Sequence, residues 1–333
     1  MTENYPIDFV IMWVDGNDPA WREESSKYYR EETGVDASTA RVREWDNLQY
    51  WFRSVEKFTP WVNKIHFVTW GHLPKWLNAK HPKLHIVKHG DYIPKEYLPT
   101  FSTMAICLNL HRIEGLSEHF VTFDDDMFIG YETDRTRFFR KGLPVDFAQL
   151  TPLTPILPFA HYTLNCVAII QQRHNILSSI LKNPYKWFCP KYGVGTLLKN
   201  ASLVPWSTNV GFKNPHIATP YLRSTHEKLW KEEFSILDAS SRNKFRNYAD
   251  VYDWLMRYEQ LVTGNFVPNG IRDTRVDTIS DTNAYEIANY IVKQKYRLFC
   301  INDSNDIKDF EKCKGVINAA FEKILPTKCT FEI

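Results

Sequence analysis

Apolar and polar positions in the first third of the chain alternate between the pattern of a buried strand and that of a helix. Ile7–Val14 is a near-continuous apolar run, typical of a strand buried on both faces. Pro19 suits the first turn of a helix, and the charged stretch Ala20–Glu32 continues it. In Glu44–Phe58 the apolar side chains recur at helical spacing, so one face of this helix is expected to pack on a sheet.

Three further strands and one helix continue this alternation. The strands are expected at Lys64–Trp70, Leu84–Val87 and Phe120–Phe123, and a helix at Ser102–Leu116 precedes the last of them. Strands that alternate with helices favour a mostly parallel sheet covered by helices. The pattern therefore predicts an α/β fold.

From about Pro152 the pattern becomes mainly helical. Prolines break the chain into turns near this point, and three later stretches have helical spacing: Asn165–Leu181, Pro220–Phe234 and Ala249–Val262. Near the C-terminus, Tyr296–Ile301 predicts a further strand, and Phe310–Leu325 predicts a helix with one apolar stripe.

This order of elements predicts two parts. An α/β core is expected to contain residues 1–151 and 295–333, with the C-terminus returning to the sheet. A mainly helical insertion, residues 152–294, is expected to interrupt it. A chain of 333 residues can bury a core large enough for this arrangement.

Composition narrows the classes of protein. The formal net charge is only +2, which does not indicate a partner among the nucleic acids. Six cysteines are spread without a CxxC pair, as in a cytosolic protein with reduced thiols. The N-terminus lacks the pattern of a signal peptide, and no apolar run approaches the ~20 residues of a membrane span. We expect a cytoplasmic location.

Two acidic clusters follow predicted strands, where open α/β sheets bind ligands. In the first, Gly16 permits a tight turn between Asp15 and Asp18; the alternative is an ordinary turn whose Asp side chains cap the next helix. The second is the run Asp124, Asp125 and Asp126. Adjacent carboxylates favour a divalent cation that bridges a diphosphate, although a solvated acidic turn is the alternative.

Two polar groups come later in the chain. The first comprises His216, Arg246 and Asp250, in which a neutral His can accept a hydroxyl proton and Arg can grip phosphate oxygens. The alternative for His216 is a core or capping residue. The second is Cys300-Ile301-Asn302-Asp303 at a strand end, for which a helix N-cap is the alternative. Motifs of P-loop, dinucleotide-binding, zinc-protease and serine-hydrolase enzymes are absent from the sequence.

Four stretches of the sequence, in order, resemble the four conserved regions of the Stealth family. They are IDFVIMWVDGNDP, the long run from REWDNLQYWFRSVEKF to FVTFDDDMFIG, NPHIATPYLRSTHEKLWKEEF with KFRNYADVYDWLMRYEQLVTGNF, and FCINDSNDIKDFEKCKGVINAAFEKILPTKCTFE. This family comprises bacterial capsular and exopolysaccharide phosphotransferases and the catalytic part of the lysosomal-enzyme N-acetylglucosamine-1-phosphotransferase. Two positions depart from the family pattern: Asp124 stands where Asn is common, and Cys107 where Glu is common.

The resemblance implies a fold like that of metal-dependent GT-A glycosyltransferases. It also implies a nucleoside-diphosphate-sugar donor, a divalent cation (Mg²⁺ or Mn²⁺) and a phosphodiester-linked product. We expect a UDP-sugar as the donor and a glycan hydroxyl as the acceptor, which receives a sugar-1-phosphate while UMP leaves. A conventional glycosyltransferase that releases UDP is the alternative, and a binding protein without activity is another. Peripheral association with a polysaccharide synthesis or export complex at the inner face of the membrane is a further expectation.

Site roles follow from the residues that match the family and from the chemistry of phosphoryl transfer, with Arg43 added as a donor contact. The cation is expected at Asp125 and Asp126, with Asp303 as a further ligand. Arg246 is expected to hold the phosphate, and His216 to act as general base toward the acceptor hydroxyl. The predicted donor contacts are Asp15, Gly16, Asp18, Arg43 and Asn302.

Overall fold

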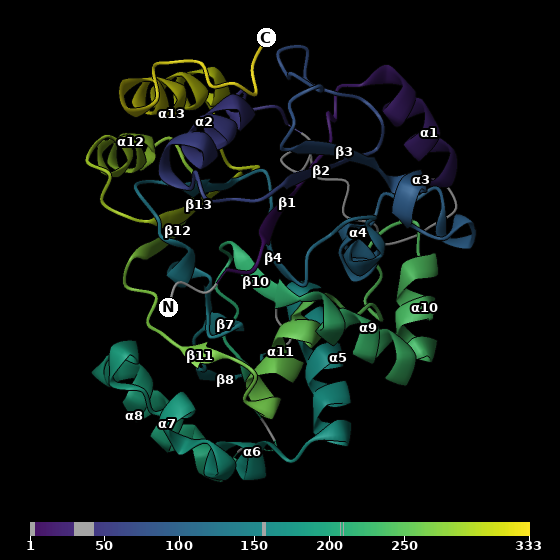
Figure 1. Ribbon diagram of the computed structural model, residues 1–333, viewed down its shortest axis with the longest axis vertical. Coiled ribbons are helices and arrows are strands. Elements are labelled where there is room, and N and C mark those ends of the chain that lie inside the picture. The colour runs from purple at the N-terminus through teal and green to yellow at the C-terminus, as the bar shows by residue number, and fades with distance from the viewer. Residues whose placement is uncertain (1–3, 30–42, 155–157, 207, 209) are drawn as a thin grey trace.

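A five-stranded sheet in the order β10-β4-β1-β2-β3 runs through the centre of the protein (Figure 1). The computed structural model describes residues 4–29, 43–154, 158–206, 208 and 210–333. The neighbouring pairs β4-β1, β1-β2 and β2-β3 are parallel, and only β10 at the edge is antiparallel to its neighbour β4. The strands are β1 (Ile7–Trp13), β2 (Ile65–Thr69), β3 (Leu84–Lys88), β4 (His119–Phe123) and β10 (Thr219–Leu222).

Both faces of this sheet are covered by helices, which explains the continuous apolar run of β1. Alternate strand residues point to opposite faces. Accordingly, Phe9 and Ile11 belong to one buried cluster, and Val10 belongs to the other. The first cluster includes side chains of α2 (Leu48–Phe58), α12 (Ala284–Val292) and α13 (Phe310–Ile324). The second includes side chains of α4 (Thr103–Leu108), α5 (Pro158–Arg173), α9 (Arg223–Glu232) and α11 (Trp254–Thr263).

A second sheet, in the order β12-β13-β5, packs beneath α12 and α13. Its strands are β12 (Thr274–Thr278), β13 (Leu298–Asn302) and β5 (Met127–Ile129). Because β5 follows β4 after only three residues, the Asp124–Asp126 turn connects the two sheets. This turn therefore lies where strands from distant parts of the chain meet.

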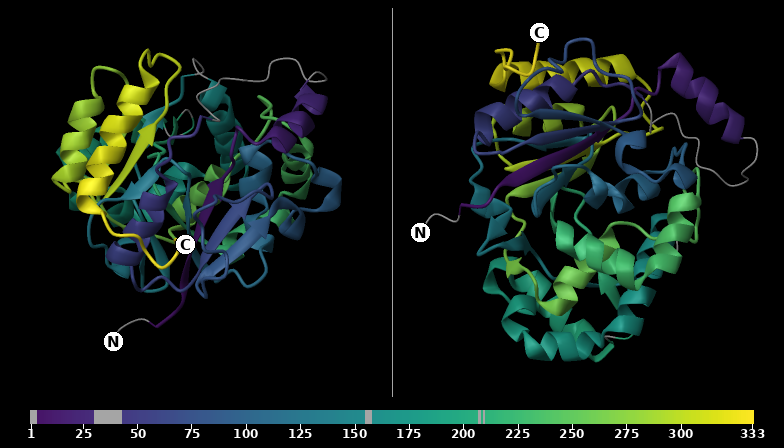
Figure 2. Two further views of the ribbon diagram at one scale, coloured as in Figure 1. Left: turned by 90° about the horizontal axis from the view of Figure 1, so that it is seen from above. Right: turned by 45° about the vertical axis from the view of Figure 1, so that its right-hand side comes forward.

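The remaining helices surround the sheets (Figures 1 and 2). Helix α1 (Pro19–Tyr29) follows β1, α3 (His89–Tyr92) packs against β3, and α10 (Phe234–Arg242) packs against α4 and α9. At the end of the molecule opposite α13 lie α6 (Ile176–Lys182), α7 (Pro184–Trp187) and α8 (Val194–Leu203). Five short strands form two further small sheets, β11-β7-β6 and β8-β9. They are β6 (Phe139–Arg140), β7 (Leu143–Asp146), β8 (Leu150–Pro152), β9 (Val210–Phe212) and β11 (Val267–Pro268).

The structure confirms the α/β class and the parallel character of the main sheet. It corrects four helix predictions. Residues 220–222, expected at the start of a helix, belong to strand β10, because they pair with β4. The helix expected at Ser102–Leu116 ends at Leu108, and the one expected at Ala249–Val262 begins only at Trp254. The Asn165–Leu181 stretch is divided between α5 and α6, where Asn175 accepts a hydrogen bond from the Ser178 backbone N–H.

The division into a core and an insertion over residues 152–294 stays a prediction. Within that range, β10 joins the central sheet, and α12 packs against α13 near the C-terminus. Some residues of the range 152–294 therefore pack with the sheets and helices assigned to the core. Among the helices that the structure describes, none is long and apolar enough to cross a membrane.

Candidate active site

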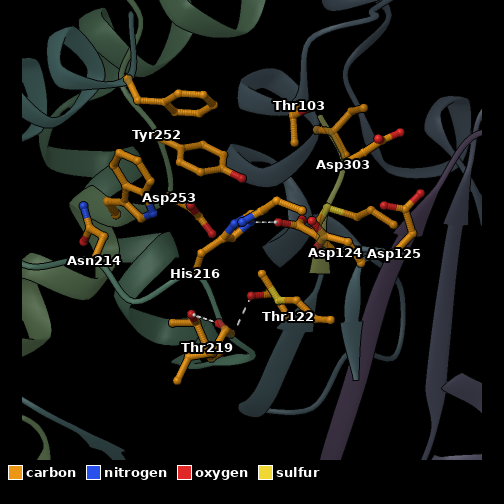
Figure 3. Close-up of a pocket in the computed structure, with 18 of the residues that line it drawn as sticks. Thr103, Thr122, Asp124, Asp125, Asn214, His216, Thr219, Tyr252, Asp253 and Asp303 are labelled. Atoms are coloured by element: carbon orange, nitrogen blue, oxygen red, sulfur yellow. Dashed lines mark hydrogen bonds and ion pairs between the residues drawn. The ribbon is translucent and has the colours of Figure 1, made fainter. Parts of the chain in front are cut away.

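A cavity of about 1250 Å³ opens at the carboxyl ends of β1 and β4, between the sheet and the helices α5 and α11 (Figure 3). This is the edge at which open α/β sheets bind ligands. Carboxylates line one part of the cavity, and aromatic side chains line another. The acidic lining residues are Glu44, Asp124, Asp125, Asp126, Asp253 and Asp303.

Strand pairing brings His216 to Asp124. Thr219 of β10 lies opposite Thr122 of β4 in an antiparallel register, so the residues before Thr219 pass beside those after Thr122. As a result, His216 Nε2 lies 3.0 Å from Asp124 Oδ2, across 92 positions of sequence (Figure 3). The His216 side chain is 45% exposed because it faces the cavity.

The electrostatics of the cavity favour the charged form of His216. Burial acts to lower its pKa, but the hydrogen bond with Asp124 and the charges of Asp126 and Asp124 outweigh it and raise the pKa to about 9. At neutral pH the ring is therefore an imidazolium paired with a carboxylate. This protonation state differs from the neutral ring that a general base requires.

The second sheet places Asp126 beside Cys300. Met127 pairs with Cys300 between β5 and β13, and the Ile301 backbone N–H donates to the Asp126 carbonyl at 2.9 Å. Potential metal-ligating atoms of Asp126, His216 and Cys300 all lie within 4.8 Å of one another. The Oδ1 atom of Asp126 is buried and has no hydrogen-bond partner among the described residues. A buried carboxylate oxygen without a partner is costly unless a ligand supplies one.

Acidic groups in and beside this cluster have raised pKa values. Desolvation within the cavity, followed by the charges of Asp126 and Asp124, raises the pKa of Asp125 well above its usual range, although the residue is exposed at the surface of the cavity. Burial also raises the pKa of Asp126, against the opposing effect of the His216 charge. The Cys300 thiol pKa is raised by burial and then by the Asp126 carboxylate, so the thiol stays protonated. Added positive charge would stabilise the ionised carboxylates.

Asp303 lies apart from this cluster and pairs with Arg43. The guanidinium donates from Nε to Asp303 Oδ2 at 2.9 Å and from NH2 to Oδ1 at 2.5 Å. Trp45 Nε1 donates to Asp303 Oδ2 at 3.1 Å. Asn302, the preceding residue, lines the cavity. Two predicted site residues, Arg43 and Asp303, are thus joined although 260 positions separate them.

The turn after β1 lies outside the residues that line the cavity. Asp18 Oδ1 accepts a hydrogen bond from the Trp21 backbone N–H at 2.8 Å and so caps the start of α1. Asp15 Oδ1 accepts from the Asn17 backbone N–H, and the carbonyl of Gly16 accepts from Arg22 Nε. The geometry matches the capping alternative for Asp18, and the roles of Asp15, Gly16 and Asp18 in donor binding stay predictions.

Arg246 lines the cavity, whereas Asp250 does not. Arg246 donates to Thr103 Oγ1 at 3.0 Å, and its guanidinium lies 5.4 Å from the centroid of the Phe159 ring. Asp250 is buried and accepts hydrogen bonds from Asn243 Nδ2 at 2.6 Å and from the Asn247 backbone N–H at 2.8 Å. Asp250 therefore stabilises the loop that carries Arg246, and it does not line the cavity together with His216 and Arg246.

Two acidic residues of the cavity were missed by sequence reasoning. Asp253 immediately precedes α11, and burial followed by the Asp124 charge raises its pKa to about 7. Glu44 accepts a hydrogen bond from Trp13 Nε1 at 3.3 Å, and burial raises its pKa. Both are single acids in mixed stretches, so no local pattern marked them.

Cys107, at the position where the resemblance leads one to expect Glu, is fully buried beneath the cavity. Its Sγ lies 3.3 Å from Met12 Sδ and 3.8 Å from the Tyr252 hydroxyl. Burial, and then the charge of Asp253, raises the thiol pKa well above its usual range. The residue is therefore a neutral packing group at the base of an acidic site.

The fold and the site define an α/β protein with an acidic cavity at the carboxyl edge of its main sheet. Residues 5–30 match conserved region 1 of the Stealth proteins, and residues 41–145 match conserved region 2. The chain is 41% identical over 332 residues to a capsular polysaccharide phosphotransferase, WcwK, of Streptococcus pneumoniae, with 98% of each chain covered.

Other curated relatives give the same picture. The chain is 35% identical to an exopolysaccharide phosphotransferase, cps2G, of Lactiplantibacillus plantarum, covering 98% of this chain and 96% of the relative. It is 36% identical to a receptor polysaccharide phosphotransferase, WefC, of Streptococcus gordonii, covering 98% and 99%. The protein belongs to the Stealth family.

Among solved structures, the galactosyltransferase LgtC in complex with donor and acceptor sugar analogs matches with a TM-score of 0.35 and 11% identity, covering 94% of this chain and 95% of that one. The bifunctional glycosyltransferase WbbM matches with a TM-score of 0.35 and 8% identity, covering 97% of this chain and 52% of that one. Likeness at this level carries no argument, so the GT-A character of the fold stays a prediction.

Proposed function

We propose that this protein is a sugar-1-phosphate transferase of capsular or exopolysaccharide synthesis. It moves hexose-1-phosphate or N-acetylhexosamine-1-phosphate from a UDP-sugar to a hydroxyl of a glycan acceptor and releases UMP. The observation that carries this proposal is similarity over nearly the whole chain to relatives named capsular and exopolysaccharide phosphotransferases. The large acidic cavity supports it, because a diphosphate donor needs space and charge neutralisation.

In the proposed reaction, the acceptor hydroxyl oxygen attacks the phosphorus that bears the sugar. The phosphoanhydride bond to UMP breaks, and the bond between the sugar C1 and its oxygen stays intact. Catalysis of such a transfer consists mainly of positioning and of stabilising charge on the phosphoryl oxygens. Arg246, which lines the cavity, is the proposed guanidinium for those oxygens.

We propose that Asp126 holds a divalent cation, Mg²⁺ or Mn²⁺, with Asp125 as a second ligand. Carboxylate oxygens are the ligands that these ions prefer, and the unpartnered Oδ1 atom of Asp126 provides one. When bound, the cation supplies charge neutralisation at the diphosphate. Asp303 is already bonded to Arg43 and Trp45, so we propose that it orients Arg43 for donor binding rather than holding the cation.

His216 is the proposed proton acceptor for the attacking hydroxyl. Its pKa is high because the carboxylates of Asp124 and Asp126 stabilise the imidazolium. Any neutralisation of those carboxylates lowers the pKa again and favours the neutral ring. The contact with Asp124 also fixes the orientation of the ring toward the cavity.

The aromatic part of the cavity is the proposed acceptor side. Phe159, Tyr252 and Trp254 line it, with ring centroids 6.5 Å apart for Phe159 and Trp254 and 5.0 Å apart for Tyr252 and Trp254. The faces of these rings can cover the C–H faces of sugar residues. Arg246 lies over Phe159 and thereby connects this wall to the phosphate-binding part.

We place the protein in the cytoplasm, at the inner face of the membrane beside a polysaccharide synthesis or export complex. All six cysteines are buried with free thiols, which supports a reducing compartment. This proposal gives the enzyme access to cytoplasmic UDP-sugars.

Product analysis tests the proposal. The purified protein is incubated with several UDP-sugars, Mg²⁺ or Mn²⁺, and a panel of oligosaccharides, and UMP is resolved from UDP. We expect UMP and a product heavier by one sugar phosphate, both abolished by EDTA and by Asp126→Asn. UDP with a product heavier by a bare sugar would identify a conventional glycosyltransferase instead, and donor binding without turnover across the panel would identify a binding protein.

A further inference from the structure

Apolar side chains are exposed on three consecutive helices at one end of the molecule. Leu181 on α6 is 68% exposed, Tyr185 on α7 is 63% exposed, and Val194 and Leu198 on α8 are 71% and 66% exposed. Burying such side chains is normally favourable. In Figures 1 and 2 these helices form the end of the molecule farthest from α13.

The exposure follows the helical period. On α6, Leu177 and Leu181 are one turn apart and exposed, whereas Ile176 and Ile180 are buried. On α8, Val194 and Leu198 are likewise one turn apart. Helices α6 and α8 therefore each carry an exposed apolar stripe, in addition to the side that packs against the rest of the protein.

Charge on this part of the chain has one sign. The sequence has 39 acidic residues, yet residues 147–226 contain neither Asp nor Glu. The exposed charges beside the apolar stripes are Lys182, Lys191 and Lys199. Trp206 lies just beyond α8 and is 62% exposed, and Trp is a favoured side chain at membrane interfaces.

We propose that this surface docks on an anionic lipid bilayer. The α6–α8 surface is defined by Leu177, Leu181, Tyr185, Val194, Leu198, Lys182, Lys191 and Lys199. Apolar side chains that enter the interface, surrounded by lysines that contact lipid phosphates, are the features by which soluble proteins bind such membranes. The inference specifies a surface for the peripheral location proposed above and does not depend on the transferase activity.

Charge distinguishes a bilayer from a second copy of the chain. In a two-fold dimer the same patch lies on both subunits. The lysines of one α6–α8 surface would then face those of the other, with no acid between residues 147 and 226 to compensate them. Anionic lipid headgroups are complementary to this surface, and a second copy is not.

Vesicle co-sedimentation of the full-length protein tests the proposal. We expect binding to vesicles of phosphatidylglycerol mixed with phosphatidylcholine, weaker binding to phosphatidylcholine alone, and a loss of binding at high salt. The double variant Leu181→Glu/Leu198→Glu should bind at least about tenfold more weakly, because each Glu both removes apolar contact and repels phosphate. The variant Lys182→Gln/Lys199→Gln should weaken binding about fivefold for each lysine.

Matched substitutions at the other end of the molecule serve as controls. Tyr285 on α12 is 62% exposed, so Tyr285→Glu should leave binding unchanged, as should Lys293→Gln/Lys323→Gln. The proposal is overturned if the wild-type protein does not bind the anionic vesicles, or if the Leu181→Glu/Leu198→Glu variant binds them as well as the wild type. It is also overturned if the wild type is a dimer that this variant dissociates, since a second copy would then cover the surface.

Discussion

At the scale of single residues, the two ring nitrogens of His216 contact side chains from different parts of the chain. Its Nε2 contacts Asp124, and its Nδ1 lies 3.8 Å from Cys300 Sγ. The ring is thus held between Asp124, just after β4, and Cys300 of β13. A change at this residue alters charge and geometry together.

Replacing His216 with Ala should reduce kcat by about 10²–10⁴-fold, the usual contribution of a general acid or base. Donor affinity should change less than kcat, because Arg43 and Arg246, the cationic residues proposed to contact the donor, remain in the cavity. Rates of UMP release and isothermal titration with the UDP-sugar measure the two effects separately. His81→Ala, at the surface beside Thr330, is the matched control. Normal turnover by His216→Ala would remove this residue from the mechanism.

At the scale of elements, a single carboxylate links three helices, α5, α9 and α11. Glu259 on α11 is 3% exposed and accepts hydrogen bonds from Lys228 on α9 at 2.8 Å and from Arg173 on α5 at 3.4 Å. His174 lies 2.8 Å away. Burial acts to raise the Glu259 pKa, but the hydrogen bonds from Lys228 and His174 lower it overall.

Glu259→Gln should lower the free energy of unfolding by about 2 kcal/mol, because it weakens the hydrogen bonds that Lys228 and Arg173 donate to a buried charged group. Glu232, which also pairs with Arg173 but is 41% exposed, provides the matched comparison. Glu232→Gln should cost less than about 1 kcal/mol, as exposed ion pairs usually do. Urea denaturation followed by circular dichroism measures both, and equal losses would show that burial of Glu259 is not the cause.

At the scale of the whole molecule, buried histidines connect folding to pH. Burial lowers the pKa of His226 to about 4, and of His111 to about 2. Their folded pKa values lie below the unfolded value of about 6.5. As the pH falls through that value, the unfolded chain takes up protons that the folded chain does not, so these groups make the protein less stable in acid. Asp253, whose pKa is raised, contributes the opposite slope.

A variant comparison isolates this effect. His226 packs against Phe120 and Tyr221, and its buried Nε2 has no partner among the described residues, so His226→Phe preserves the packing. Relative to the wild type, the variant should gain about 2–3 kcal/mol of stability between pH 7 and pH 4.5. Denaturant midpoints across this range give the difference. Parallel curves for the two proteins would contradict a neutral buried His226.

Two elements whose pattern lies within one stretch of sequence were predicted correctly, whereas one that depends on pairing with a distant strand was not. β1 was expected at Ile7–Val14 and lies at Ile7–Trp13, because a strand buried on both faces needs a continuous apolar run. The last helix was expected at Phe310–Leu325 and ends at Ile324, because its apolar stripe repeats over four turns. Residues 220–222 were expected in a helix, since a short apolar pattern fits either state, and pairing with β4 made them part of a strand.

The sequence by itself determined the alternation of strands and helices, the family to which the resemblance pointed, the acidic run at residues 124–126 and the acid-free segment over residues 147–226. These features are local in the chain. Only the tertiary structure decided that His216 meets Asp124, that Asp126 meets Cys300, and that Arg43 binds Asp303. Such contacts join residues up to 260 positions apart. They depend on strand register and sheet order, which no local pattern of residues specifies.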